Sequence, residues 1–319
     1  PTTFHVVGGR NDGAIDIESL MPADIHIREG DSIEWTSRGY EGHTVTFATQ
    51  EQLAAIMSAY LQPDPADPEQ KIFNPEFALP RGNRTIDGSG AYVNSGFIGV
   101  PAEGTYTLTF TERGVYQYLC VVHPLWMRGT VAVDAPDARV ESPEMVSARG
   151  AGDMERYREA ATRAVDEAAA QRRTVPGPDG TSVHHVAVGV VTPYGQIATY
   201  IPAGLTIRAG DTVIFENDER NFHNVVFKGS LAEPPPAYDV YVDPETGGIN
   251  VALAKESAAA VDPPPDGFDD QTFLSSGSMG IVMPRSRWQL TFDNPGRYAY
   301  NCTIHAFAGM AGVIDVQPR

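Results

Sequence analysis

Two short segments of the chain place a cysteine, a histidine and a methionine at closely similar spacing. The first is CVVHPLWM, from Cys120 to Met127, and the second is CTIHAFAGM, from Cys302 to Met310. In both segments the histidine follows the cysteine by three residues. A thiolate, an imidazole and a thioether, joined by a second imidazole, form the trigonal ligand set with a long axial methionine that suits copper in electron transfer. The spacing therefore predicts two copper sites.

The second imidazole of each site must come from another part of the chain. His43 in YEGHTVTF and His223 in NFHNVVF each follow a polar turn and open an alternating apolar run, which predicts a position at the mouth of a strand. They precede Cys120 and Cys302 by 77 and 79 residues, nearly the same spacing in both halves. The predicted metal ligands are His43, Cys120, His123 and Met127 in the first site, and His223, Cys302, His305 and Met310 in the second.

The segments that must position these ligands also occur twice. MPADIHIREGDSIEWTS, from Met21, aligns with IPAGLTIRAGDTVIFEN, from Ile201, and the same offset of 180 residues places the two early histidines on each other. Each unit consists of short alternating apolar runs broken by Gly, Pro, Asn and Asp, which is typical of a β-sandwich. We predict an all-β protein with two β-sandwich domains, at residues 1–140 and 181–319, joined by a helical linker at 141–180.

Three segments interrupt the β pattern. In the linker, Asp153 is expected to cap a helix whose apolar stripe packs on a domain, and PGPDG ends that helix. The first insert, residues 48–93, begins with a capping-box signature that predicts a helix. The second insert, residues 228–271, is expected to be extended loop with a short helix near 251–260. The inserts can shield the metal sites, dock a partner, or only decorate the surface.

Each unit resembles a cupredoxin of the plastocyanin type. HNVVF at His223 and C-x-x-H-x-x-x-x-M from Cys302 match the plastocyanin pattern in residue type and spacing, whereas the first unit has one residue fewer between His123 and Met127. The resemblance implies two Greek-key sandwiches, each with one type 1 (blue) copper, and therefore two coppers per chain that transfer electrons. It also implies that the edges of His123 and His305 reach the surface within an apolar patch, where electrons enter.

The residue after the first histidine of each site differs between the units. In the family this residue helps to hold the thiolate, and here it is Thr44 in one unit and Asn224 in the other. Because hydrogen bonding around the ligands tunes a metal, we predict distinct reduction potentials for the two coppers.

Composition limits the partners. A formal net charge of −18 argues against nucleic acid and anionic membranes, and it permits steering by a basic redox partner, such as a basic cytochrome or another copper protein. Both cysteines lie in the predicted sites, which leaves none for a disulfide once copper is bound; a structural disulfide between them is the competing interpretation, and the repeated Cys–His spacing favours the metal. No apolar run is long enough to form a transmembrane segment. From the resemblance and from the start at Pro1 we expect an exported protein, periplasmic or extracellular, with membrane association possible through a removed leader or a lipid anchor.

A copper enzyme is the alternative function. Two-domain cupredoxins include nitrite reductases and small laccases, which form homotrimers and bind an additional interface copper through several histidines. In this chain Leu119 and Asn301 precede the cysteines and no His-x-His pair occurs, so an electron carrier is favoured over a copper-dependent oxidoreductase. Copper storage would need exposed Met-rich or His-rich tracts, which the sequence lacks. Four further histidines are expected to be solvated strand residues, with another metal site as the alternative: His5, His26, His184 and His185.

Overall fold

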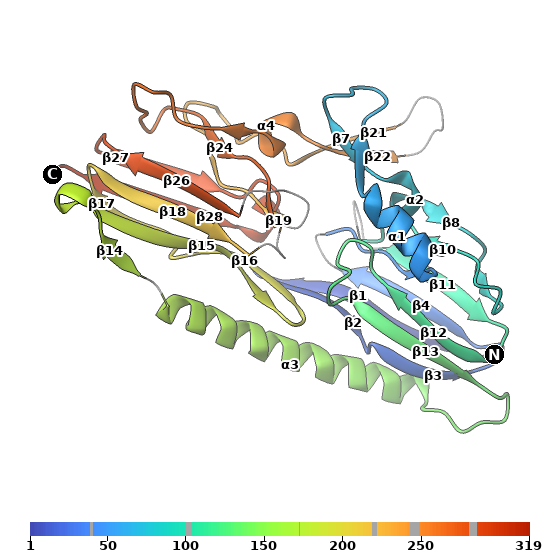
Figure 1. Cartoon of the computed structure of the whole chain (residues 1–319). Helices are drawn as coiled ribbons and strands as arrows, with labels where there is room; N and C mark the ends of the chain where they lie inside the picture. Colours follow the sequence, from blue (N-terminus) through green and yellow to red (C-terminus); the bar gives the residue numbers. More distant parts are fainter. Residues whose placement is uncertain (39–40, 100–103, 172, 219–221, 243–248, 281–285) are drawn as a thin grey trace.

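Two β-sandwiches lie side by side, with the chain termini at opposite ends of the molecule and one long helix running alongside both (Figure 1). The structure is a computed structural model, and it describes residues 1–319 except 39–40, 100–103, 172, 219–221, 243–248 and 281–285. The predicted all-β fold with a helical linker is confirmed. Among the described residues, no helix has the length and apolar character needed to cross a membrane.

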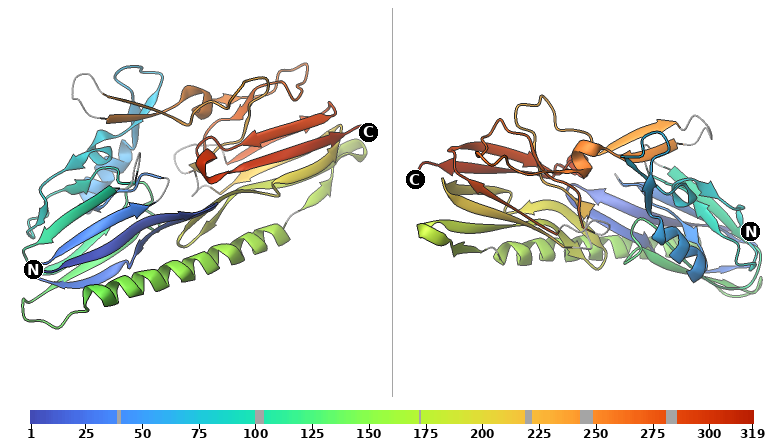
Figure 2. Two further views of the ribbon diagram at one scale, coloured as in Figure 1. Left: turned by 180° about the vertical axis from the view of Figure 1, so that it is seen from behind. Right: turned by 45° about the horizontal axis from the view of Figure 1, so that its top comes forward.

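One ten-stranded sheet passes through both halves (Figure 2). Strand β2 (Ile15–Met21) of the first half pairs antiparallel with β16 (Gly195–Ile201) of the second half, and this pairing sets Gln196 opposite Asp16. Backbone hydrogen bonds therefore fix the two halves relative to each other. The other strands of this sheet are β26 (Arg287–Phe292), β18 (Asp211–Asn217) and β15 (Ser182–Thr192) on the side of β16, with β14 (Thr174–Pro176) beside β15, and β1 (Thr3–Asp12), β4 (Ser32–Arg38), β11 (Gly104–Phe110) and β9 (Thr85–Ile86) on the side of β2.

Each sandwich is completed by a six-stranded sheet of its own, and the two sheets repeat the same order. In both, a parallel pair at one edge continues through antiparallel strands that lead to the metal ligands. The first sheet contains β3 (Asp24–Arg28), β13 (Arg128–Asp134), β12 (Gly114–Leu119), β5 (Thr46–Phe47), β10 (Val93–Ser95) and β8 (Pro80–Arg81). The second contains β17 (Gly204–Arg208), β28 (Ala311–Gln317), β27 (Gly296–Asn301), β20 (Val226–Phe227), β24 (Leu274–Ser276) and β23 (Ala260–Val261).

Each sandwich has its own aromatic core. In the first, the buried rings of Trp35 and Tyr118 meet edge to face with centroids 5.3 Å apart. In the second, Phe215 and Tyr300 meet at the same centroid distance. Alternation along the strands explains these cores, because residues two apart on a strand face the same side. The repeated sequence thus encodes two separate hydrophobic cores under a shared sheet.

The linker helix α3 (Pro143–Ala170) begins earlier than predicted. Ser142 caps it, with its side chain accepting from the backbone amide of Met145, and proline occupies the first helical position. The predicted cap Asp153 is wrong: this residue lies inside the helix, where it is buried and pairs with Arg156. The helix packs against β1 and β2 of the first half and β15 and β16 of the second, so it braces the junction between the halves (Figure 2).

The inserts interlock above the junction. Helix α1 (Gln50–Ser58) starts at the predicted capping box of Thr49 and Gln52. The expectation of extended loop in the second insert is wrong for its centre, because β21 (Tyr238–Val242) and β22 (Ile249–Leu253) form a hairpin, and β22 pairs with β7 of the first insert. The remaining elements are β6 (Leu61–Pro63), β7 (Lys71–Phe73), α2 (Pro75–Ala78), η1 (Pro178–Gly180), β19 (Phe222–His223), α4 (Lys255–Ala258), β25 (Met279–Gly280) and η2 (Ala306–Ala308).

Candidate metal centres

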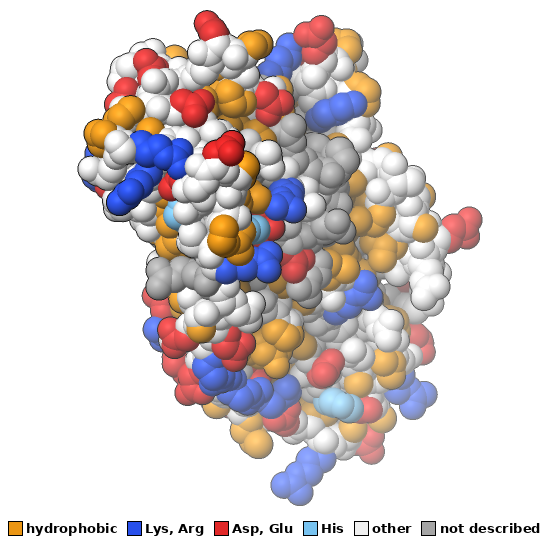
Figure 3. Space-filling model, turned by 60° about the vertical axis from the view of Figure 1, so that its left-hand side comes forward, with side chains coloured by type: hydrophobic (Ala, Val, Ile, Leu, Met, Phe, Trp, Pro, Cys, Tyr) orange, Lys and Arg blue, Asp and Glu red, His pale blue; other side chains and the backbone are white. Residues whose placement is uncertain are grey.

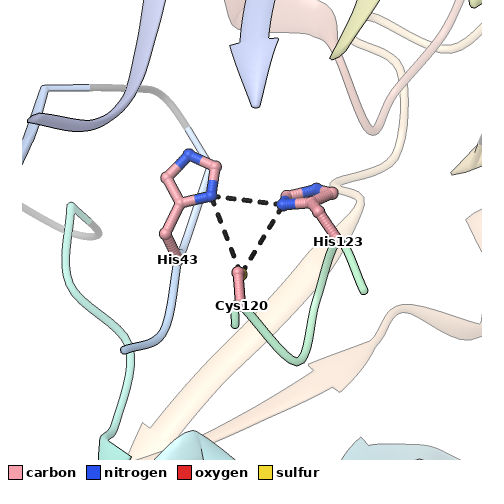
Figure 4. A group of neighbouring side chains, drawn as sticks. All are labelled: His43, Cys120 and His123. Carbon is pink, nitrogen blue, oxygen red and sulfur yellow. Dashed lines mark hydrogen bonds between the residues drawn. The ribbon is translucent and has the colours of Figure 1, made fainter. Parts of the chain in front are cut away.

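The first centre is a triangle of buried ligand atoms at the end of the first sandwich (Figure 4). The Nδ1 atoms of His43 and His123 lie 3.2 Å apart, and the Sγ of Cys120 lies 4.0 and 3.8 Å from them. Atoms that share one metal ion at about 2.0–2.3 Å in a trigonal arrangement lie roughly 3.5–3.8 Å from one another. The three measured separations lie within a few tenths of an ångström of this range, so the donor types and positions fit a single soft metal ion.

The second centre repeats this triangle in the other sandwich. The Nδ1 atoms of His223 and His305 lie 3.0 Å apart, and the Sγ of Cys302 lies 3.8 and 3.5 Å from them. All three side chains are buried. The two halves thus position equivalent donors in the same way, as the repeat predicted.

The methionines lie within the same loops. The carbonyl oxygen of Met127 accepts from the amide of Cys120 at 2.9 Å, and that of Met310 accepts from the amide of Cys302 at 3.0 Å. Both methionine side chains are buried. Each loop therefore folds back on its cysteine, so the backbone of each predicted methionine lies beside the cysteine of its own triangle.

The residue after the first histidine ties the two loops of each centre together. The backbone amides of Thr44 and Asn224 point at the sulfur atoms of Cys120 and Cys302, at 3.2 and 3.5 Å. Their side-chain oxygens accept hydrogen bonds, both of 2.8 Å, from backbone amides in the cysteine loops. The role that the resemblance implied for these residues is therefore visible in the geometry.

The surroundings of Cys120 lower the pKa of its thiol. Burial would raise the pKa of the Cys120 thiol, but hydrogen bonds to His123 and His43 and the charges of these rings outweigh burial and hold the pKa well below its ordinary value. Because the thiolate is the metal-binding form of cysteine, this environment favours the ligand state.

A tight backbone position supports His43. Gly9 has φ +83° at an irregularity in the pairing of β1 with β2, and a Cβ atom there would overlap the Nε2 of the His43 ring. A residue without a side chain is therefore needed behind this ring.

The outer edges of His123 and His305 face each other across the junction instead of reaching the surface. One carboxylate lies between them: Glu41 Oε2 is 2.9 Å from Nε2 of His123, and Glu41 Oε1 is 2.5 Å from Nε2 of His305. The His123 and His305 side chains are only 9% and 1% exposed. The expectation of surface-exposed histidine edges is wrong, because the two cysteine loops point toward each other and the shared sheet holds them there.

Further polar groups from the shared sheet surround this carboxylate. Glu18 accepts hydrogen bonds of 2.6 Å from Trp126 Nε1 and from Gln196 Nε2, and its Oε1 lies 3.4 Å from His123 Nε2. Asp16 is also buried, two residues earlier on β2. These residues were not among the predicted site residues, although two acids within the largely apolar strand IDIESLM were a usable signal.

The pKa values of these three carboxyl groups are pushed apart. Burial raises the pKa of Asp16 to about 7 and that of Glu18 to about 8. Burial acts on Glu41 in the same direction, but the charge of His305 and the hydrogen bonds from His123 and His305 outweigh it and hold the Glu41 pKa well below its ordinary value. Glu41 is therefore the carboxylate that carries the negative charge between the two rings.

The interlocked inserts cover this polar cluster with apolar side chains. A cavity of about 60 Å³ lies beside Glu18 and Glu41, and its wall includes Tyr60 and Phe73 from the first insert and Tyr238 from the second. The rings of Phe73 and Tyr238 have centroids 6.2 Å apart, so the two inserts meet there. The shielding role considered for the inserts is thus supported at this junction.

Each of the four remaining histidines pairs with a single carboxylate. The pairs are His5 with Glu34, His26 with Asp134, His184 with Asp211 and His185 with Glu216. Within the described part of the chain, none of them belongs to a group of three ligand-type side chains.

Comparison with known proteins identifies the family. The sequence matches the copper binding proteins of the plastocyanin/azurin family over residues 11–134 and again over 186–317. The chain therefore belongs to this family, whose members bind copper and transfer electrons.

Individual relatives match about two fifths of the chain. Plastocyanin from Prochlorothrix hollandica is 31% identical over 118 residues, which cover 37% of this chain and 63% of that protein, slightly less than two thirds of its length. Plastocyanin from Rumex obtusifolius is 23% identical over 118 residues, 37% of this chain and 87% of that protein. Among solved structures, a mutant of amicyanin in the Cu(I) state matches 41% of this chain and 82% of its own, with 20% identity and a TM-score of 0.25.

Proposed function

We propose that this protein is an electron carrier with one type 1 copper in each domain. His43, Cys120, His123 and Met127 are the proposed ligands of the first copper. His223, Cys302, His305 and Met310 are those of the second. The observation that carries the proposal is the pair of buried triangles of two Nδ1 atoms and one Sγ atom.

The chain supplies a rigid, dry setting for this chemistry. Copper, when bound, supplies a one-electron couple between Cu(I) and Cu(II). Thr44 and Asn224 hold the cysteine loops to the histidine loops, so the donors keep their positions when the charge of the metal changes. The methionine thioethers would supply a further weak donor to each copper and tune its potential. Burial of the ligands keeps water away and limits rearrangement.

An enzyme with an additional interface metal is a second candidate. It is favoured by one observation: ligand atoms of Glu18, Glu41 and His123 lie within 4.8 Å of one another at the junction. However, His123 already directs Nδ1 into the first triangle, so its Nε2 could bind another metal only after the ring lost its second proton. We therefore favour the electron carrier over a copper oxidase or a nitrite-reductase-like enzyme. Only the enzyme, the second candidate function, would imply that the chain forms a homotrimer.

The acidic character of the chain supports a basic redox partner. With a formal net charge of −18, long-range attraction would speed encounter with a basic cytochrome or copper protein. On the face drawn in Figure 3, acidic and basic side chains are interspersed with hydrophobic ones, so this face does not concentrate the excess of acid. We also propose export, to a periplasmic or extracellular location, because plastocyanin-like relatives are exported proteins.

Single-site variants test the proposed function. Copper titration of the unaltered chain should saturate at two equivalents, with the intense visible absorption of a copper–thiolate bond. Cys120→Ser and Cys302→Ser should each lose one equivalent and about half of this absorption. If both variants kept the full absorption, or if the unaltered chain bound no copper, the proposal would be wrong.

A further inference from the structure

One carboxylate joins the two proposed copper centres. Glu41 is the only side chain among the described residues that lies within 3.0 Å of the Nε2 atoms of both His123 and His305. These two rings are also proposed ligands, one from each domain. The domains are fixed in this orientation by the pairing of β2 with β16 and by helix α3. The bridge is therefore part of the fold and does not depend on a chance approach of two side chains.

The tautomers of the two rings follow from the donor geometry. Each ring turns Nδ1 toward the cysteine sulfur of its own domain, at 3.8 Å for His123 and 3.5 Å for His305. A neutral imidazole that offers a bare Nδ1 to a metal keeps its proton on Nε2. Both Nε2–H groups then donate to Glu41, one to each oxygen. An ionised carboxylate accepts two such bonds without needing a proton of its own.

The resulting path between the centres is short. The two Nε2 atoms are separated by one carboxylate and two hydrogen bonds, and the separation is at most about 8 Å by ordinary bond lengths. Gln196 borders the bridge, and its Nε2 donates to Glu18 Oε1 at 2.6 Å. Apolar side chains of the interlocked inserts cover the bridge.

We propose that Glu41 is a positioning residue that links the two centres, so that an electron passes between them inside the chain along His123, Glu41 and His305. This inference rests on the proposed function. The step is balanced within the molecule: one electron leaves the reduced centre of one domain, which becomes oxidised, and reduces the oxidised centre of the other. No proton crosses the bridge, because both Nε2–H groups stay on their rings. The chain would then act as a two-centre relay, with electrons entering at one domain and leaving at the other.

Glu41→Gln is the sharpest perturbation. A glutamine amide has nearly the same shape, but it offers one accepting oxygen and one donating NH₂ group. It can therefore accept a hydrogen bond from only one of the two Nε2–H groups. Its NH₂ group faces the other Nε2–H group, and two donors cannot form a hydrogen bond with each other. The matched control is Glu216→Gln, which removes a carboxylate 3.0 Å from Nδ1 of His185 and outside both ligand sets.

The experiment measures internal electron transfer in the copper-loaded full chain. All proteins carry Met310→Gln, so that the altered axial ligand shifts the absorption of the second centre and the two centres can be followed separately. A light-activated external electron donor reduces one centre, and redistribution of the electron between the two centres is then recorded. Glu41→Gln should slow it by about tenfold or more, since one charge-assisted hydrogen bond of the path is lost. Glu216→Gln should leave the rate unchanged.

A second readout needs no electron transfer. In the Cu(I) protein, NMR should find the Nε2–H protons of His123 and His305 hydrogen-bonded and slow to exchange with water, and Glu41→Gln should release at least one of them. If Glu41→Gln kept two coppers and an unchanged transfer rate, the link would be overturned while the proposed function stood. A third metal bound in the unaltered chain and lost in Glu41→Gln would also overturn it, since Glu41 would then be a ligand. If the unaltered chain bound no copper at all, both the Glu41 link and the proposed function would be contradicted.

Discussion

Gly9→Ala should disable the first centre alone. An alanine at φ +83° carries the strain of a left-handed backbone, about 1–2 kcal/mol. In addition, its Cβ would overlap the Nε2 of His43, so the ring must move and carry Nδ1 away from the triangle. Loss of a supporting contact to a metal ligand commonly costs 10–100-fold in affinity, and here the ligand itself is displaced. We therefore expect affinity at the first centre to fall by about 100-fold or more.

Gly30→Ala provides the matched control. Gly30 lies in the same domain with φ +90°, and a Cβ there would meet nothing within 4 Å. This variant should lose a similar 1–2 kcal/mol or so of unfolding free energy but keep its metal sites.

Copper titration, monitored through the copper–thiolate absorption, distinguishes displacement of the His43 ring from backbone strain alone. The unaltered chain and Gly30→Ala should bind two equivalents tightly, whereas Gly9→Ala should bind one tightly and one weakly. Urea unfolding of the metal-free proteins measures the backbone strain separately. Two equally tight equivalents in Gly9→Ala would refute the view that the His43 ring must stay where Gly9 permits it.

Three further predictions concern stability and redox behaviour. Burial alone would raise the pKa of Asp211, but hydrogen bonds from the backbone amides of Arg208 and Ser182 and the interaction with His184 outweigh burial, so the pKa is lowered. Asp211→Asn should therefore cost about 1–3 kcal/mol of unfolding free energy at pH 7. That loss should shrink as the pH falls from about 4 through the lowered folded-state value, and urea unfolding that shows the same loss at pH 7 and pH 2.5 would contradict it. A redox titration should resolve two potentials, because Thr44 and Asn224 approach the sulfurs at different distances, and a single potential would count against this. Removing copper should lower the melting temperature, since a ligand that binds only the folded state stabilises it; equal melting temperatures with and without copper would contradict binding to the folded sites.

Much of the fold was predictable because it is locally encoded. The alternating strands, the capping box at Thr49 and the 180-residue repeat are properties of neighbouring residues or of direct sequence comparison. The start of α3 was misplaced because Asp153 and Ser142 are both capable caps, and tertiary contacts decide between them. The hairpin of the second insert was missed because β22 finds its partner β7 in the other insert, far away in sequence.

The ligand sets were predictable for a different reason. Cysteine, histidine and methionine at fixed spacing are few in this chain, and the repeat doubles the signal. The junction was not predictable, because pairing of β2 with β16 is a contact between the halves that neither half encodes alone. The position of Glu41 between His123 and His305 follows from that pairing. The same contact explains why the histidine edges are buried here.

A crystal structure of the copper-loaded chain, with anomalous scattering recorded at the copper absorption edge, tests the central claim most directly. The account predicts two copper peaks, one within the triangle of His43, Cys120 and His123, and one within the triangle of His223, Cys302 and His305. A single peak, a peak outside these triangles, or a bond between the two cysteine sulfurs would contradict it.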